Sequence, residues 1–274
     1  MKIAHIIHPV IVKPSSDLVA AQPVTFETMR IACEFTGFSK EAVDISLYAI
    51  QYHDERRIPL PGCFTRVPDL QRSVADIKTF KVRRKLALLK DILDALYSAA
   101  GDADYLIYTN VDIALQPYFY LTISKFIRQK FDAFVINRRT ISQDYQSPGE
   151  IPMMFSKLGE KHPGWDCFVF KRSLYPAFEL GTACIGTGWI GRVVITNLAC
   201  FAERFKIFTD LHTTFHIGDD LSWKSGRFDD YLEHNKNQCR RILTDFDEKY
   251  GPLDRDRFPG RFFRLLERNL ENNQ

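Results

Sequence analysis

The sequence predicts an α/β fold with a mostly parallel central sheet and helices on its faces. In the middle of the chain, short apolar runs rich in Ile, Val, Phe and Tyr alternate with stretches whose apolar residues recur at helical spacing. Strands that alternate with helices are typical of a parallel sheet covered by helices. No repeat, low-complexity segment or linker interrupts the 274 residues, so we expect a single domain over residues 1–274.

Two strands, a helix and a long loop are expected in the first 79 residues. A buried strand is expected in KIAHIIHPV, residues 2–10, where Pro9 breaks it. A helix is expected in TFETMRIACEF, residues 25–35, with Thr25 as its N-cap, and a second strand in VDISLYAIQY, residues 43–52. Residues 53–79 carry three prolines, a glycine and many charges, which predicts a long loop of the kind that often serves function.

The clearest helix signal in the chain is RRKLALLKDILDALYSAA, residues 83–100. Leu86, Leu89, Leu93 and Leu96 fall on one face of that helix. Gly101 is expected to end it.

The remaining elements continue the alternation. Strands are expected in YLIYTNVD (105–112), FDAFVIN (131–137), DCFVFKRSLY (166–175) and, followed by a turn, FKIFTDLHTTFHIGDD (205–220). Helices are expected in YLTISKFIRQK (120–130), TGWIGRVVITNLACFAERF (187–205) and a basic, aromatic C-terminal stretch at about residues 255–270. Residues 141–164 are expected to form a second long loop.

Net charge, cysteine spacing and the length of the apolar runs argue against several classes of protein. A net charge of +3 is too small to indicate nucleic acid as the main partner. The six cysteines form no C-x-x-C pair, which indicates free thiols in a reducing compartment. No run approaches the ~18 apolar residues of a membrane span, and the N-terminus does not have the pattern of a signal peptide. We therefore expect a cytoplasmic protein.

The stretch NVD, residues 110–112, carries the first chemical signal, because it places polar residues directly after an apolar strand. In an open α/β sheet, ligands bind at the carboxyl ends of the strands. Residues i and i+2 of an extended chain point to the same side, so Asn110 and Asp112 are expected to project together. Such a pair can hold a hard divalent cation. The alternative is a turn in which either side chain bonds only the backbone.

The first strand, the helix KLALLKDIL and the segment ADYLIYTNVDIAL together resemble the nucleotide-sugar domain of GT-A-type glycosyltransferases. The resemblance extends over roughly residues 1–225 and implies a Rossmann-like GT-A fold with helices on both faces of the sheet. In that superfamily a D-x-D motif ends a central strand, and its last Asp binds a divalent metal that bridges the donor diphosphate. The last Asp corresponds to Asp112 here, and Asn110 replaces the first. The resemblance implies that Asn110 contacts either the metal or only the ribose or sugar of the donor.

Two later segments resemble the same superfamily. HPGWDCFVF, residues 162–170, is similar to the acceptor-side segment and implies that Asp166 is the catalytic carboxylate. Asp166 would take the acceptor proton in an inverting reaction, or orient the acceptor or stabilise the oxocarbenium-like state in a retaining one. The alternative role for Asp166 is a turn cap. TTFHIGDD, residues 213–220, implies that His216 completes the metal site opposite Asp112, with His212, Asp219 and Asp220 as rivals.

The implied metal ligands are one carboxylate and one imidazole, a set that suits Mn²⁺ better than Mg²⁺. Arg83, Arg84 and Lys85 stand at the start of the predicted helix, where a helix N-terminus and arginine side chains favour a diphosphate. A solvated basic face is the alternative for these three residues.

Further contacts are implied by position in the superfamily. His8 and Pro9 would lie near the nucleoside. Trp165 and Trp189 offer flat faces to a sugar ring, although a buried core role is the alternative. The basic C-terminal helix could contact an anionic membrane peripherally, or simply pack against the domain.

The hypothesis from sequence is a metal-dependent glycosyltransferase that moves a sugar from a nucleotide-sugar donor to a hydroxyl of a carbohydrate or glycolipid acceptor. A nucleotidyltransferase is a second hypothesis. Such an enzyme usually needs a glycine-rich loop after the first strand, and HPVIVKPSS contains no glycine, so this hypothesis ranks lower. A non-catalytic carbohydrate- or protein-binding domain is a third, because fold alone does not determine function.

Overall fold

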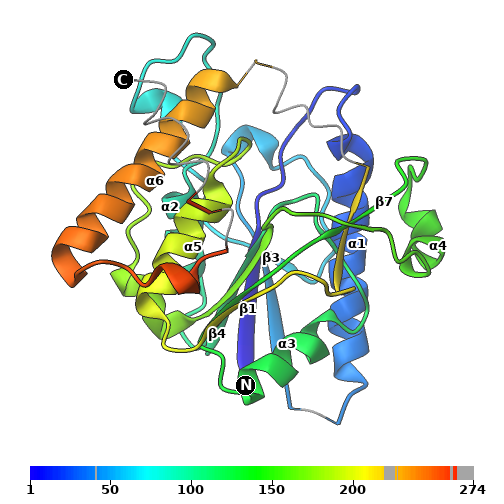
Figure 1. Cartoon of the computed structure of the whole chain (residues 1–274). Helices are drawn as coiled ribbons and strands as arrows, with labels where there is room; N and C mark the ends of the chain where they lie inside the picture. Colours follow the sequence, from blue (N-terminus) through cyan, green and yellow to red (C-terminus); the bar gives the residue numbers. More distant parts are fainter. Residues whose placement is uncertain (41, 219–225, 227, 260–261, 264–274) are drawn as a thin grey trace.

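The structure is a computed structural model that describes the chain except for residues 41, 219–225, 227, 260–261 and 264–274 (Figure 1). The strands are β1 (Lys2–Ile7), β2 (Asp44–Ala49), β3 (Phe64–Arg66), β4 (Tyr105–Thr109), β5 (Ala114–Leu115), β6 (Ala133–Ile136), β7 (Arg139–Ile141), β8 (Glu160–Lys161), β9 (Cys167–Lys171), β10 (Phe205–Phe208) and β11 (Thr214–Ile217). The α-helices are α1 (Leu18–Gly37), α2 (Leu89–Ala99), α3 (Phe119–Arg128), α4 (Ile151–Phe155), α5 (Ile190–Phe201) and α6 (Asp229–Tyr250).

Within the described residues, the larger sheet has seven strands in the order β10-β6-β9-β4-β1-β2-β3. Neighbouring strands are parallel except for β9, which runs antiparallel to both β4 and β6. The carboxyl ends of β1, β2, β4 and β6 therefore share one edge of the sheet with the amino end of β9. The predicted α/β class with a mostly parallel sheet is confirmed.

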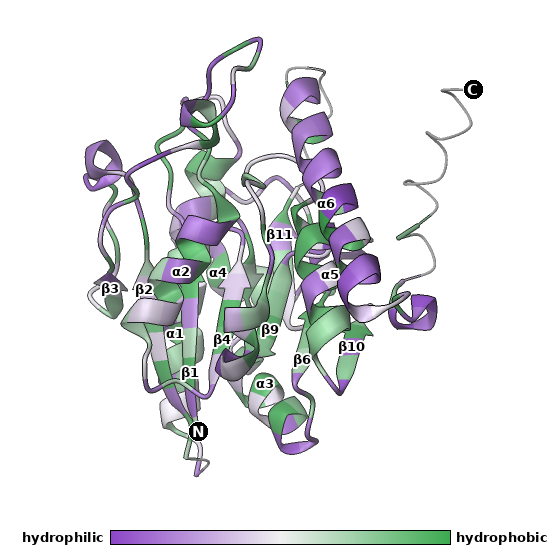
Figure 2. Ribbon diagram, turned by 90° about the vertical axis from the view of Figure 1, so that its left-hand side faces the viewer, coloured by the Kyte–Doolittle hydropathy of each residue, from purple (hydrophilic) through white to green (hydrophobic). Residues whose placement is uncertain are grey.

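Helices cover both faces of this sheet, because alternate residues of each strand point to opposite sides. In β1, Ala4 and Ile6 belong to a core shared with α2, α5 and α6, whereas Ile3 and Ile7 belong to a second core shared with α1 and α3. Figure 1 shows these two groups of helices on opposite sides of the strands. Figure 2 shows hydrophobic residues concentrated along the strands, with much of the hydrophilic colour on α6 and the outlying loops. The predicted helices on both faces are confirmed.

A smaller sheet, ordered β5-β11-β7-β8 in the described part of the chain, stands at the carboxyl end of the larger one. β5 follows β4 after a short turn, and β7 follows β6 directly. Phe215 and Ile141 of the small sheet pack with Met154 of α4 and Val24 of α1. The small sheet is therefore fixed to α1 and overhangs the strand ends of the large sheet. None of the described helices has the length and apolar content needed to cross a bilayer.

The first predicted helix is longer than its sequence signal. α1 begins at Leu18, and the carboxylate of Asp17 caps it by accepting a hydrogen bond from the Leu18 amide at 2.8 Å. Thr25 lies fully buried inside the helix, so its predicted role as N-cap is wrong. Pro23 lies in the second turn, where it removes one backbone donor without ending the helix.

The helix predicted over residues 83–100 begins only at Leu89. The backbone before it is engaged by other loops, since Leu88 forms a bridge with Cys184 and the Leu89 amide donates to the Ala183 carbonyl at 2.9 Å. These backbone groups are thus not available to a helical turn. Residues 83–85 do not lie at a helix N-terminus, and that premise for diphosphate binding is wrong.

Other boundaries also differ. The strand predicted over residues 105–112 ends at Thr109, and residues 110–113 turn, with the Ile113 amide donating to the Asn110 carbonyl at 3.2 Å. The strand predicted over residues 166–175 gives way to a 3₁₀ helix at Arg172, and residues 205–220 contain two strands, one in each sheet. Helix α6 was not predicted. The predicted C-terminal helix at about 255–270 lies mostly outside the described residues, apart from a 3₁₀ turn at Arg255–Arg257.

Candidate active site

Two side chains predicted as metal ligands meet at the carboxyl edge of the large sheet. Asp112 follows β4, and His216 lies on β11 of the small sheet. The Nε2 atom of His216 lies 3.1 Å from Oδ2 of Asp112. His216 is buried and the Asp112 side chain is 22% exposed, so the pair is shielded on one side and open on the other. The structure brings these residues together, and their binding of a metal stays a prediction.

Hydrogen bonds and charge orient this pair. The Nδ1–H group of His216 donates to the Gly218 carbonyl at 2.6 Å, which leaves Nε2 directed at Asp112. Burial would raise the pKa of Asp112, but the charge and hydrogen bond of His216, with a contribution from Arg138, bring that pKa below its ordinary value. Burial also opposes the charged form of His216, but Asp112 outweighs it and the pKa of His216 is raised. Each group therefore stabilises the charged form of the other.

The donor set of this pair fits a divalent cation. Two ligand atoms 3.1 Å apart can share one cation about 2.1 Å from each. The second carboxylate oxygen of Asp112, Oδ1, is buried and has no hydrogen-bond partner among the described residues. A carbonyl that holds the far nitrogen of an imidazole is a common support for a histidine ligand. The described part of the chain has no group of three His, Cys, Asp or Glu side chains around a common point, and Asp219 and Asp220 lie outside it.

Asp166, the predicted catalytic carboxylate, lies beside this pair. Because β9 is antiparallel, its first residue, Cys167, pairs with Thr109 of β4 and with Ile136 of β6. Asp166 therefore lies at the same edge as the residues that follow those two strands. Its Oδ1 accepts a hydrogen bond from Nδ2 of Asn110 at 3.2 Å.

An arginine that the sequence interpretation missed completes the cluster. Arg138 follows β6, is 8% exposed, and places Nη1 3.7 Å from Oδ2 of Asp166. Its Nη2 lies 3.3 Å from Nε2 of His162, whose Nδ1 accepts from the Gly164 amide at 2.8 Å. The signal was present, since Asn137 and Arg138 come directly after the apolar run of a predicted strand just as NVD does, and the same strand-end argument would have found them.

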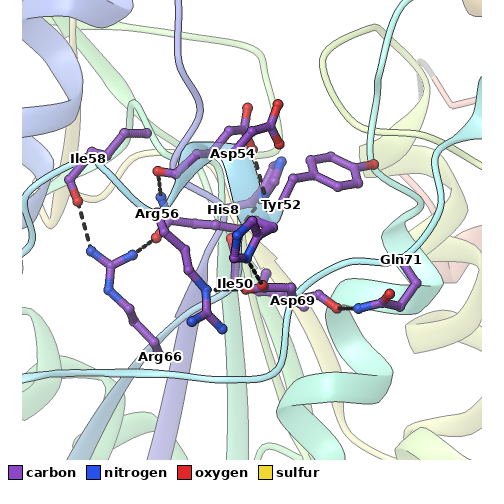
Figure 3. Close-up of polar contacts among 12 residues, drawn as sticks. His8, Ile50, Tyr52, Asp54, Arg56, Ile58, Arg66, Asp69 and Gln71 are labelled. Carbon is purple, nitrogen blue, oxygen red and sulfur yellow. Dashed lines mark hydrogen bonds and ion pairs between the residues drawn. The ribbon is translucent and has the colours of Figure 1, made fainter.

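His8, which was predicted to lie near the nucleoside, lies at the ends of β1 and β2 within the polar cluster that Figure 3 shows. His8 is buried, and its Nδ1–H group donates to the Ile50 carbonyl at 2.8 Å. Burial lowers the pKa of His8 to about 4, so its imidazole is neutral near pH 7. Asp69 accepts from Nε of Arg56 at 2.7 Å in the same cluster. Pro9 is buried beside His8.

The side chains of the three consecutive basic residues at positions 83–85 have different surroundings. Arg83 faces Asp76 at 2.6 Å with a largely exposed side chain. The Arg84 guanidinium lies over the Phe228 ring, 4.3 Å from its centroid. Lys85 lies over the Tyr52 ring at 4.0 Å, and its charge contributes to lowering the pKa of His8. Lys85 also pairs with Asp54 at 2.5 Å, so each of the three residues has a partner within the protein, and Lys85 is the one that lies beside His8 at the strand ends.

The two tryptophans lie next to the Asp166 side of the cluster. The Arg192 guanidinium carbon lies 4.4 Å from the centroid of Trp189 and 5.3 Å from that of Trp165. Trp189 caps α5 with a φ of 78°, a conformation uncommon for an aromatic residue. Contact of Trp189 with a donor stays a prediction. His212, the rival ligand, instead contacts the Lys157 carbonyl at 2.8 Å.

Comparison with known proteins supports the fold assignment. No protein-family model matches the chain, and no curated protein matches it significantly in sequence. The chain is similar to the structure of Staphylococcus aureus TarS residues 1–349 in complex with UDP-GlcNAc, with a TM-score of 0.51 and 10% identity over 100% of this chain and 78% of that one. The chain thus has the GT-A-type fold of nucleotide-sugar glycosyltransferases.

Two further structures are similar at lower scores. One is a putative nucleotide-diphospho-sugar transferase from Desulfovibrio desulfuricans G20, with a TM-score of 0.38, 9% identity, and coverage of 88% of this chain and 97% of that one. The other is the galactosyltransferase LgtC in complex with donor and acceptor sugar analogues, with a TM-score of 0.37, 9% identity, and coverage of 85% and 96%. The fold assignment rests on the TarS match alone, and no family is identified for the chain.

Proposed function

We propose that this protein is a metal-dependent glycosyltransferase that moves a sugar from a nucleoside diphosphate to a hydroxyl group of an acceptor. The observation that carries the proposal is the contact of Asp112 with His216 at 3.1 Å, beside Asp166, at the carboxyl edge of a GT-A-type sheet. A carboxylate–imidazole pair next to a second carboxylate supports this proposal over a non-catalytic binding domain, and the absence of glycine from HPVIVKPSS supports it over a nucleotidyltransferase.

Each group at the candidate site is proposed to have a separate chemical role. Asp112 and His216 would hold a divalent cation, Mn²⁺ rather than Mg²⁺ because one ligand is a nitrogen, and that cation would offset charge on the leaving diphosphate. Asp166 would accept the proton of the attacking hydroxyl in an inverting reaction. Arg138 places a fixed positive charge between these two groups, where charge develops during transfer.

The donor side is proposed to lie at the ends of β1 and β2. His8, Pro9, Tyr52 and Lys85 border that region, and Lys85, which pairs with Asp54, is the cation proposed to meet a phosphate there. UDP is the first nucleotide to test, because the TarS structure that supports the fold assignment contains UDP-GlcNAc. A carbohydrate or glycolipid acceptor, a cytoplasmic location and peripheral membrane contact through the C-terminal segment are part of the proposal.

A thermal-unfolding experiment tests donor and metal binding. UDP at about 100 times its dissociation constant, with Mn²⁺, should stabilise the wild-type protein by about 2.7 kcal/mol and raise its Tm by several degrees. Asp112→Asn should abolish the shift, and chelation of the metal should do the same. Asp102→Asn is the matched control, because that carboxylate is 73% exposed and pairs with Lys2 at the opposite end of the sheet.

Catalysis is tested by UDP release from a panel of UDP-sugars, first without an acceptor and then with simple sugars as acceptors. Asp166→Asn should reduce turnover by about 100-fold or more without changing the Tm shift, because a general base contributes about 10²–10⁴-fold. A wild-type protein that shows no Tm shift with any nucleoside diphosphate, with or without Mn²⁺, would rule out the proposed function.

A further inference from the structure

The residue that departs from the D-x-D pattern, Asn110, uses both of its polar atoms inside the protein. Its Nδ2 donates to Oδ1 of Asp166 at 3.2 Å, and its Oδ1 accepts from the hydroxyl of Tyr108 at 3.1 Å. Asp112, two residues later, contacts His216 instead. Because the chain turns at residues 110–113, these two positions serve different groups.

We propose that Asn110, together with Arg138, is a positioning residue that fixes the carboxylate of Asp166 for proton transfer, and that it is not a ligand of the metal. The proposal rests on the proposed function, since it concerns how the base of that reaction is held. It also gives a reason for the amide at position 110.

The orientation of the amide follows from hydrogen-bond chemistry. An ionised carboxylate only accepts, so the NH₂ group of Asn110 must face Asp166 and its oxygen must face Tyr108. The Tyr108 hydroxyl then has to donate. Tyr108 belongs to β4, is 1% exposed, and stacks on Phe168 of β9 with ring centroids 6.2 Å apart. The packed core of the sheet therefore fixes the orientation of the Asn110 amide, and this amide fixes the position of one oxygen of Asp166.

A carboxylate at position 110 could not take this role. It would place an acceptor oxygen about 3.2 Å from Oδ1 of Asp166, where two like charges repel and no hydrogen joins them. The residue that restores the superfamily motif would thus disturb the base. Asn and Asp have nearly the same shape, so this substitution changes the chemistry of the contact and little else.

Arg138 acts on the other oxygen of Asp166. Its guanidinium lies 3.7 Å from Oδ2, and the backbone that carries it is fixed. The side-chain amide of Asn137 donates to the Arg138 carbonyl at 3.0 Å, and the hydroxyl of Thr214 donates to the Asn137 carbonyl at 2.6 Å. Asn110 and Arg138 therefore approach the two oxygens of one carboxylate from two different strands.

The decisive experiment compares Asn110→Asp with the wild type, by UDP release for turnover and by the Tm shift with Mn²⁺ and UDP for binding. We expect kcat to fall about 10- to 100-fold, because small displacements of a reacting group cost up to about 100-fold. The Tm shift should persist or increase, and KM for the UDP-sugar should change little. If position 110 were a metal ligand, the new carboxylate would strengthen binding and preserve or raise kcat, and that result would overturn the proposal.

A double-mutant cycle separates positioning from a general structural role. Asn110→Ala should lower kcat in the wild-type background but have little further effect in the Asp166→Asn background, because the group it positions is already gone. Equal losses in both backgrounds would refute the proposal. Arg138→Lys should retain more turnover than Arg138→Gln at similar Tm, because it keeps the charge near Oδ2, and equal losses in these two variants would remove Arg138 from the proposal.

These outcomes are distinguishable from failure of the proposed function. If the wild type does not bind UDP with Mn²⁺ or release UDP from any UDP-sugar, the glycosyltransferase proposal fails as a whole. If the wild type does both and Asn110→Asp is as active as the wild type, only the positioning proposal fails.

Discussion

Replacing Gly164 with alanine should slow the reaction while leaving donor binding intact. A Cβ atom at this position would lie 2.8 Å from Oδ2 of Asp166 and 2.7 Å from Nδ1 of His162. The first distance is about 0.6 Å short of the 3.4 Å at which ordinary contacts begin. Asp166 or the Gly164 backbone must therefore move by about that amount. Since a 1 Å misplacement can cost about 100-fold in rate, we expect kcat to fall about 10- to 100-fold.

The assay measures UDP release for kcat, the Tm shift with Mn²⁺ and UDP for donor binding, and urea unfolding for stability. The overlap should cost about 1–3 kcal/mol of unfolding free energy. Gly101→Ala is the matched control, because a Cβ atom there would meet no atom within 4 Å. Wild-type turnover in Gly164→Ala, or an equal loss in Gly101→Ala, would refute the assignment of Asp166 to the reacting carboxylate.

Three further predictions concern charge and buried polar groups. Burial lowers the pKa of His5 to about 3, so the unfolded chain binds more protons than the folded protein between about pH 3 and 6.5. As the pH falls through that window, His5 should reduce the unfolding free energy by up to about 1.4 kcal/mol per pH unit. Urea unfolding at pH 7 and pH 5 measures this loss, and the His5→Asn variant should lack the contribution. Asn235 is fully buried and hydrogen-bonds the amide and carbonyl of Cys184, so Asn235→Ala should cost about 3 kcal/mol in urea unfolding, and a loss below about 0.5 kcal/mol would contradict this. Lys85→Ala should weaken UDP binding about tenfold in the Tm assay, whereas Arg83→Ala should leave it unchanged, and equal effects would show that Lys85 has no special place.

Local sequence pattern predicted the strands and helices whose own side chains determine them. β4, β6 and α3 were found because their apolar residues are continuous or recur at helical spacing. The start of α2 could not be found in this way. Its preceding residues have helical spacing, but Leu88 and Leu89 pair with a loop nearly 100 residues away, and no local window contains that partner.

The sequence predicted several residues of the candidate site, but it did not predict how they contact one another. Asp112 was named because it follows a recognisable strand, and Asp166 and His216 because their segments resemble the GT-A superfamily; the structure places all three in one cluster. The links between them were not predictable from spacing. Asn110 points to Asp166 only because β9 runs antiparallel beside β4, and strand direction is a property of the whole sheet.

The wide separation of Asp112 and His216 along the chain has a consequence for the order in which the protein becomes active during synthesis. The two side chains are 104 positions apart, so a nascent chain exposes the carboxylate well before the ribosome has made the imidazole. A stalled or truncated translation product would have only one of the two proposed metal ligands. Under the proposed function, the protein therefore gains its metal site only after most of the domain has been translated.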